Sequence, residues 1–195
     1  MSNHRQREHS AEQITDELLV QRCQSGSRIA MEALITKWQE PLWRHAMRQT
    51  RNATLADDVL QESLVAIARK IGGLKDPGSF RTWAYRIVSN KTADLIRKRQ
   101  RNRELDAQAL EQEKQAQGEP TPNDEVGLIR AAMTRLNSRD RTILSLFYLE
   151  EMSVAEVSEI CGIPSGTVKS RLSKARSNLK KILDTHLNSN HSEHE

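Results

Sequence analysis

Apolar residues recur at three- and four-residue spacing through two long blocks of this chain, residues 14–100 and 126–184. This spacing places apolar side chains on one side of a helix, so each block is expected to form helices that pack through these sides. Glycine and proline, which interrupt helices, number only eight and five in 195 residues. The sequence therefore predicts an all-α fold with two small helical domains.

Between the two blocks the apolar pattern fades into Gln, Glu and Ala and ends in the polar run GEPTPNDE. Such a composition is typical of a flexible linker, here an acidic one. The predicted organisation has five parts: a disordered tail (1–13), a helical domain (14–101), a linker (102–125), a second helical domain (126–184) and a disordered tail (185–195).

The charges of the chain are segregated. Residues 1–103 carry 19 basic and 11 acidic side chains (net +8), whereas residues 104–126 carry one and seven (net −6). A basic front half indicates a polyanionic partner, and nucleic acid is the partner that we expect.

Several classes of function lack their motifs. The sequence contains no P-loop, no dinucleotide-binding glycine pattern, and neither H-E-x-x-H nor G-x-S-x-G. Cys23 and Cys161 form no C-x-x-C pair, so neither a disulfide framework nor a zinc site is indicated. No apolar run approaches membrane-spanning length. We therefore expect a cytosolic protein that is not an enzyme and needs no cofactor or metal.

The segment FRTWAYRIVSNKTADLIRKRQRNR, residues 80–103, carries eight basic side chains and one acid. On a helical wheel, one side holds Phe80, Trp83, Ala84, Ile87, Val88 and Leu95. The opposite side holds Tyr85, Arg86, Ser89 and Arg97. One face can thus pack on a core while the other offers positive charge to phosphates and flat rings to bases. The alternative is a solvated basic helix with aromatic core anchors.

Capping signals mark several helix starts. Thr54 to Asp57 and Ser153 to Glu156 both have the form of a capping box. The helix opened by Ser153 ends at a Cys-Gly pair, an Ile-Pro turn follows, and Ser165 is well placed as the next N-cap. Between Ser165 and Lys181 there are six basic residues and no acid. A short helix, a turn and a basic helix are the parts of a helix-turn-helix.

These segments together resemble the extracytoplasmic-function (ECF) class of bacterial RNA polymerase sigma factors. FRTWAYRIVSNKTADLIRKRQR is similar to the family's −10 recognition and melting segment, and DDVLQESLVAIARKI to the helix that docks on the β′ clamp helices. EEMSVAEVSEICGIPSGTVKSRLSKARSNLKKIL is similar to its −35-binding helix-turn-helix. One departure is Leu136-Asn137-Ser138, where the family usually has Leu-Pro; it alters a helix-start signal rather than a DNA contact.

The resemblance implies core RNA polymerase (β′ clamp helices and β flap) and promoter DNA as partners, and it leaves open whether an anti-sigma factor binds. It implies core-polymerase contacts at Asp57, Asp58, Leu60, Gln61 and Glu62. For the −10 element it implies Phe80, Trp83, Arg86, Asn90, Lys91, Arg97 and Lys98. For the −35 element it implies Ser165, Lys169, Ser170, Arg171, Lys174 and Arg176.

Three alternatives remain at this point. The chain could be a helix-turn-helix regulator that binds duplex DNA without the polymerase. Asn90 either helps the loop Lys75–Ser79 to hold a flipped −10 base, as the resemblance implies, or merely bonds within the bundle. The sequence also does not decide which arginine of the last helix reads a base and which binds a phosphate.

Overall fold

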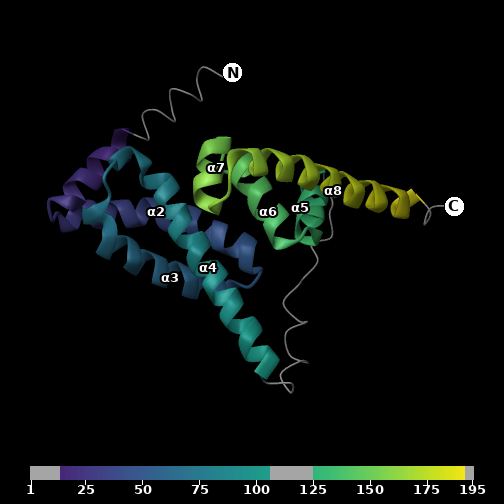
Figure 1. Cartoon of the computed structure of the whole chain (residues 1–195), viewed down its shortest axis with the longest axis horizontal. Helices are drawn as coiled ribbons and strands as arrows, with labels where there is room; N and C mark the ends of the chain where they lie inside the picture. The colour runs from purple at the N-terminus through teal and green to yellow at the C-terminus, as the bar shows by residue number, and fades with distance from the viewer. Residues whose placement is uncertain (1–13, 106–124, 192–195) are drawn as a thin grey trace. The chain divides into compact units, whose positions relative to one another are not determined.

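The computed structural model describes residues 14–105 and 125–191 (Figure 1). The predicted N-terminal tail, most of the predicted linker and the last four residues lie outside this range. The described residues form helices and turns without a strand, as the all-α prediction requires. The chain divides into two compact units, residues 1–104 and 105–195, which are described separately below.

Unit 1 is a helical bundle. Its elements are a first helix over residues 14–24, α2 (Arg28–Thr50), α3 (Ala53–Lys70), the 3₁₀ turns η1 (Ile71–Gly73) and η2 (Pro77–Ser79), and α4 (Phe80–Leu105). α2 stays a single helix through Pro41. The largest fully buried side chains of the unit are Val20, Leu34, Leu42, His45, Ile67, Phe80, Tyr85 and Val88. They come from all four helices, so the helices share one core.

The start of α3 differs from the prediction. The helix begins at Ala53, and the Asn52 side chain accepts a hydrogen bond from the Leu55 N–H at 3.0 Å. The capping box predicted at Thr54 is therefore wrong, because Asn52 already caps the helix two residues earlier. Arg51, at φ 56°, ends α2 in the left-handed conformation, so the two helices join with almost no loop.

The buried face of α4 is turned relative to the predicted one. Tyr85, which was expected on the polar side, is fully buried. Its ring meets Trp38 and His45 of α2 edge-on, at centroid distances of 6.2 and 4.9 Å. The side of α4 that faces α2 is thus a second contact surface, and Tyr85 belongs to this surface rather than to the solvent.

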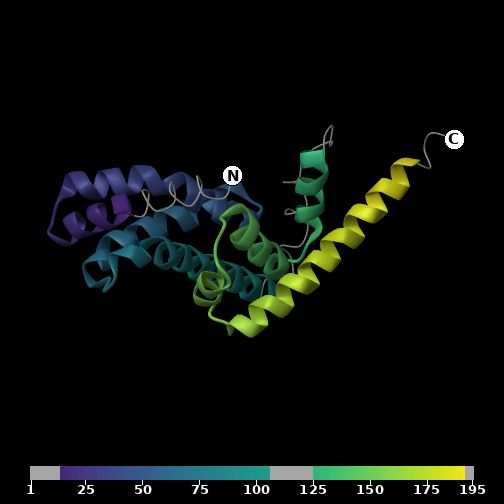
Figure 2. The same ribbon diagram turned by 90° about the horizontal axis from the view of Figure 1, so that it is seen from above.

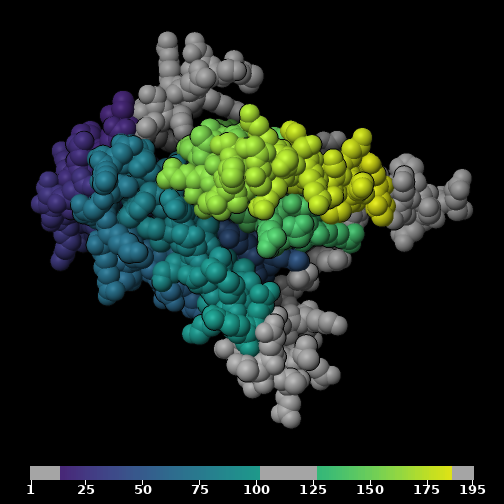
Figure 3. Space-filling model, in the orientation of Figure 1, coloured from purple at the N-terminus to yellow at the C-terminus, as the bar shows by residue number. Residues whose placement is uncertain are grey.

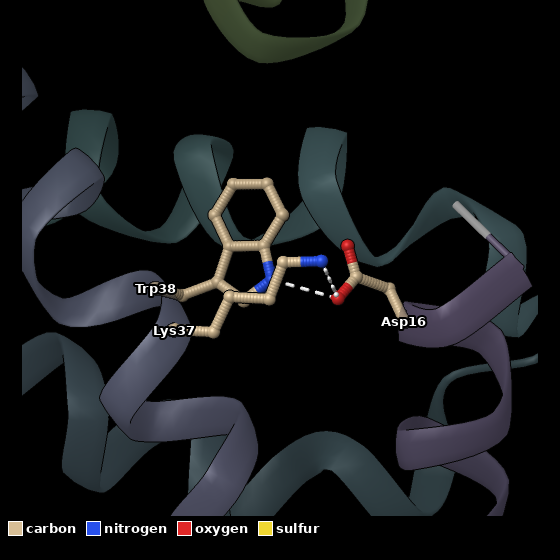
Figure 4. Close-up of polar contacts among 3 residues, drawn as sticks. All are labelled: Asp16, Lys37 and Trp38. Carbon is tan, nitrogen blue, oxygen red and sulfur yellow. Dashed lines mark hydrogen bonds and ion pairs between the residues drawn. The ribbon is translucent and has the colours of Figure 1, made fainter. Parts of the chain in front are cut away.

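A buried carboxylate joins the first helix to α2 (Figure 4). Asp16 is 7% exposed, and its Oδ1 accepts hydrogen bonds from Lys37 Nζ at 2.8 Å and from Trp38 Nε1 at 3.2 Å. A buried charge is stable only when it is paired and hydrogen-bonded, and both conditions are met here. Trp38 in turn packs against Phe80 of α4, so this contact supports the centre of the bundle.

Unit 2 consists of α5 (Glu125–Arg135), α6 (Ser138–Leu144), the π-helical turn η3 (Ser145–Leu149), α7 (Val154–Cys161) and α8 (Ser165–His191). Figure 2 shows α8 as one continuous helix, and it extends beyond the domain end predicted at residue 184. The core of the unit contains Ala132, Leu136, Ile143, Leu144, Leu146, Met152, Val157, Ile160, Val168, Leu172 and Ala175.

Polar side chains lock α6 to its neighbours. Asn137 caps α6 by accepting a hydrogen bond from the Asp140 N–H at 2.9 Å. It therefore provides a helix-start signal at the position where Leu-Pro was expected from the resemblance. The buried Asp140 carboxylate accepts from Asn178 of α8 at 3.0 Å. The buried Arg141 donates to the carbonyls of Thr134 and Leu136 at the end of α5, at 3.2 and 2.9 Å. These bonds satisfy carbonyl groups that a helix end leaves without intrahelical partners.

The helix-turn-helix is built from α7 and α8. The capping box of Ser153 and Glu156 is present as predicted. Gly162 ends α7 at φ 64°, a left-handed conformation that glycine adopts without steric cost. The Pro164 carbonyl accepts from the Val168 N–H at 3.0 Å, and α8 begins at Ser165. Ser165 is therefore the first helical residue rather than the predicted N-cap, because Pro164 already provides the first helical acceptor.

Candidate nucleic-acid interface

The outer face of α4 is basic and open to solvent. Arg86, Asn90, Arg97 and Lys98 are exposed. Arg97 pairs with Asp94 of the same helix at 2.8 Å, and both side chains are about two-thirds exposed (67% and 69%). Such an exposed pair contributes about 0–1 kcal/mol, so a phosphate can replace the Asp94 carboxylate at small cost.

Asn90 is free to bind a ligand. Its side chain is exposed and has no hydrogen-bond partner among the described residues. The alternative in which this amide bonds within the bundle is therefore not observed. Its Oδ1 and Nδ2 atoms can offer an acceptor and two donors to a base.

The aromatic side chains of α4 divide between core and surface. Phe80 is 1% exposed and packs edge-on against Trp38, so its ring is not open to a base in this structure. Trp83 is half-buried, with its ring centroid 6.0 Å from that of Phe80. Of the two aromatic residues expected at the −10 element, only Trp83 has surface exposed to solvent.

The segment before α4 is a capped turn. The Asp76 side chain accepts from the Gly78 N–H at 3.0 Å, and the Ser79 hydroxyl donates to the Asp76 carbonyl at 2.7 Å. Asn90 lies ten residues beyond Phe80, which is about 15 Å along the helix. No contact joins Asn90 to this turn within the described residues, so the predicted pocket for a flipped base stays a prediction.

α3 carries an exposed acidic stripe. Asp57, Asp58, Gln61 and Glu62 are all exposed, whereas Leu60 beside them is half-buried. Val65, 50% exposed, continues the stripe and was missed in the sequence analysis. Val65 lies four residues after Gln61 and therefore on the same side of α3, so helical spacing could have indicated it.

Two of the stripe's carboxylates are held by neighbouring helices. Trp43 of α2 donates its Nε1–H to Asp57 Oδ1 at 2.6 Å. Lys91 of α4 pairs with Glu62 at 3.0 Å, with exposures of 37% and 63%. The space-filling view shows α3 and α4 meeting on one face of unit 1 (Figure 3). The acidic stripe and the basic face of α4 thus share an ion pair.

In unit 2, α8 presents cations along its outer side. Ser165, Lys169, Ser170, Lys174 and Arg176 are exposed, and Arg171 is half-buried. Arg176 Nη1 donates to the hydroxyl of Tyr148, an exposed residue of η3, at 3.3 Å. The six predicted residues extend over about 16 Å of one helix, with the cations directed away from its buried face.

Arg171 also lies close to the end of α7. Burial raises the pKa of the Cys161 thiol, and the positive charge of Arg171 opposes part of this rise. The thiol therefore stays protonated at neutral pH and behaves as a small apolar group.

His45 is a titratable group that the sequence analysis missed. It is fully buried between α2 and α4, with Nε2 2.8 Å from Ser89 Oγ and 2.6 Å from Gln49 Nε2. Nδ1 is buried without a partner among the described residues. Burial and the charge of Arg48 lower the pKa of His45 from 6.5 to about 3, so the ring is neutral near pH 7.

Other kinds of site are not visible in the described part of the chain. Across residues 14–105 and 125–191, no three His, Cys, Asp or Glu side chains cluster as metal ligands would. None of the helices in these ranges combines the length and the apolar character needed to cross a bilayer.

Comparison with known proteins accounts for both units. The family model for Sigma-70 region 2 matches residues 34–102, and that for Sigma-70 region 4 matches residues 127–179. The chain is 30% identical over 180 residues to the ECF RNA polymerase sigma-E factor of Haemophilus influenzae, covering 85% of this chain and 94% of that protein. It is 29% identical over 176 residues to the ECF RNA polymerase sigma factor SigW of Bacillus subtilis, covering 84% and 94%.

Solved structures show the same arrangement of helices. CnrH, solved in complex with the cytosolic domain of CnrY, superposes with a TM-score of 0.64 at 26% identity and covers 88% of this chain and 98% of its own. The sigma factor RpoE of Bartonella quintana, solved with the anti-sigma factor NepR, gives a TM-score of 0.67 at 21% identity, covering 78% and 96%. The second similarity concerns the fold alone.

Proposed function

Because this chain belongs to the extracytoplasmic-function class of RNA polymerase sigma factors, we propose that its two units divide the work of directing the polymerase to a promoter. Unit 1 docks on the polymerase through α3 and captures the −10 element through α4. Unit 2 binds the −35 element through α8. The observation that carries this proposal is the acidic stripe of α3 beside the basic face of α4 in one unit. A duplex-DNA regulator has no use for such a pair of surfaces.

For α3, we propose that the stripe contacts the β′ clamp helices, with Asp58 and Gln61 as its unpaired members. These two side chains are exposed and have no hydrogen-bond partner among the described residues. Asp58→Lys should weaken binding to core polymerase without changing the thermal stability of unit 1. Equal core affinity of the variant and the wild type in a titration would contradict this assignment.

For α8, we propose that the N-terminal half enters the major groove of the −35 element. Free backbone N–H groups at the start of α8 favour binding of a phosphate. The cationic side chains on the outer side of α8 can reach the DNA backbone or base edges. Replacing an arginine that makes a bidentate guanine contact costs about 1–3 kcal/mol and relaxes specificity at that base pair. If neither Arg171→Ala nor Arg176→Ala altered −35 discrimination, α8 would not be the recognition helix.

For α4, we propose that Asn90 binds a −10 base that has left the stack, with Arg97 and Lys98 on nearby phosphates. The exposed, unpartnered amide and the exposed cations support this role. The turn before α4 is proposed to contribute to the same site when DNA is bound. Phe80 supports the site from the core instead of touching DNA.

The sequence between the units suits a tether. Because the tether joins the two units, binding of one unit to its promoter element raises the effective concentration of the other unit at the second element. We place the domain boundaries near residues 101 and 126 and propose that the acidic linker avoids duplex DNA. Its sequence suits a basic channel of the polymerase better.

We further propose that the chain catalyses no reaction itself and acts in the cytoplasm. We also propose that an anti-sigma factor binds this chain, because CnrH, which is 26% identical to it, was solved in complex with a second protein, the cytosolic domain of CnrY. The test of the whole proposal is transcription by purified core polymerase from genomic promoters, with and without this chain. Promoter-specific transcripts that need both components would support it. Specific DNA binding by the chain alone, without any stimulation of core polymerase, would favour the duplex-DNA regulator.

A further inference from the structure

The bond between Trp43 and Asp57 gives the indole a role that the sequence motifs do not assign. The Nε1 and Oδ1 atoms lie 2.6 Å apart, and a hydrogen bond to a carboxylate is stronger than one between neutral groups. Asp57 is exposed on the acidic stripe of α3, whereas Trp43 is a half-buried residue of the preceding helix. The bond therefore fixes a side chain that would otherwise rotate freely in solvent.

We propose that Trp43 is a positioning residue of the polymerase-docking surface. Its indole N–H holds Asp57 through Oδ1 and leaves Oδ2 free for a cationic side chain of the partner, with arginine the best fit. This inference rests on the proposed docking role of α3. It adds a residue from α2 to a surface that otherwise consists of α3 alone.

The physical reason is preorganisation. A carboxylate accepts about four hydrogen bonds, so one indole bond occupies a single acceptor position and leaves room for an arginine fork. A side chain that is immobilised on binding loses rotamer freedom, and this loss weakens the affinity. If the side chain is already held in place, the affinity is about 2- to 10-fold higher. Asp58, the next residue, has no such bond among the described residues and pays this loss when the partner binds.

The bond also has a purely structural interpretation, in which it only ties α2 to α3. The two interpretations differ in what depends on Asp57. A bond that only ties the two helices together affects the stability of the fold, whether or not the partner contacts Asp57. A positioning bond affects partner binding only while the Asp57 carboxylate is there to be positioned.

The experiment is a double-mutant cycle in the full chain, with affinity for core polymerase as the readout. Trp43→Phe keeps an aromatic ring and removes the N–H donor. We expect it to weaken binding about 2- to 10-fold. In an Asp57→Ala background the same change should have no further effect, whereas in an Asp58→Ala background its full effect should remain. Thermal unfolding followed by circular dichroism checks that each variant is folded.

Two results would overturn the inference: unchanged affinity of Trp43→Phe, or an equal loss with and without Asp57. Should Trp43→Phe fail to fold, Asp57→Glu replaces it, because it keeps the charge but moves the carboxylate away from the indole. Affinity close to that of Asp57→Ala supports positioning, and wild-type affinity contradicts it. Failure of the wild-type chain to bind core polymerase would instead refute the docking role of α3 and, with it, this inference.

Discussion

The buried His45 should make unit 1 sensitive to acid. Its pKa is lowered from 6.5 to about 3, first by burial and second by the charge of Arg48. As pH falls below 6.5, the unfolded chain gains a proton at this residue while the folded chain does not. Stability is therefore full above this range and is lost progressively as pH falls towards the folded pKa.

The magnitude follows from the two pKa values. Relative to neutral pH, His45 should remove roughly 2 kcal/mol of stability at about pH 5, and about 5 kcal/mol once pH lies below both pKa values. The larger figure is comparable with the whole stability of many small domains, which is about 5–15 kcal/mol. Burial is the main structural cause, because protonating the ring would place a positive charge in the interior of the bundle.

Tryptophan fluorescence can measure this effect in the intact chain. All three tryptophans, Trp38, Trp43 and Trp83, lie in unit 1, so urea unfolding followed by their emission reports that unit. The unfolding free energy is measured at several pH values for the wild type and for His45→Gln, which does not titrate. Other groups contribute equally to both proteins, so the difference between the two pH profiles belongs to His45.

Parallel pH profiles for the two proteins would refute the reasoning. A direct observation serves if His45→Gln is too unstable to measure. The ring resonances of His45 in the wild-type chain should not titrate between about pH 8 and pH 5, whereas an exposed histidine titrates near 6.5. A midpoint close to that ordinary value would show that the ring is not sealed from water.

Three further perturbations test other parts of the structure. Asp16→Ala leaves the two donors it satisfies without an acceptor and should destabilise unit 1 by about 1–3 kcal/mol in urea unfolding, whereas Asp16→Asn keeps an acceptor and should cost less. Glu62→Gln frees Lys91 and should raise the affinity of the free chain for single-stranded −10 DNA by up to about 5-fold. Asp58→Asn removes the same charge without breaking an ion pair, so it should have a smaller effect. Equal effects of the two variants would show that the release of Lys91 is not the cause. Asn90→Ala should retain core binding but lose melting of a duplex promoter in permanganate footprinting, with partial recovery on a template already mismatched at −10; normal melting by this variant would rule out the role of Asn90.

Patterns that repeat within one helix were readable from the sequence. The all-α fold, the capping box of Ser153, and the helix-turn-helix with its basic outer face all depend on residues three or four positions apart. Such neighbours meet as soon as a helix forms, so their spacing alone determines the contact. The basic faces of the segments that form α4 and α8 were visible for the same reason, whereas the polymerase-contact residues of α3 were expected only from the resemblance to the sigma-factor family.

Contacts between helices were decided only by the tertiary structure. A helical wheel shows one apolar side, but α4 packs along two sides, and this places Tyr85 in the core and Ser89 against His45. Nothing in the local pattern indicates that Trp43 meets Asp57 or that Lys91 meets Glu62, 14 and 29 residues apart. The side chains that orient the candidate surfaces come from other helices, and their partners depend on how the bundle packs.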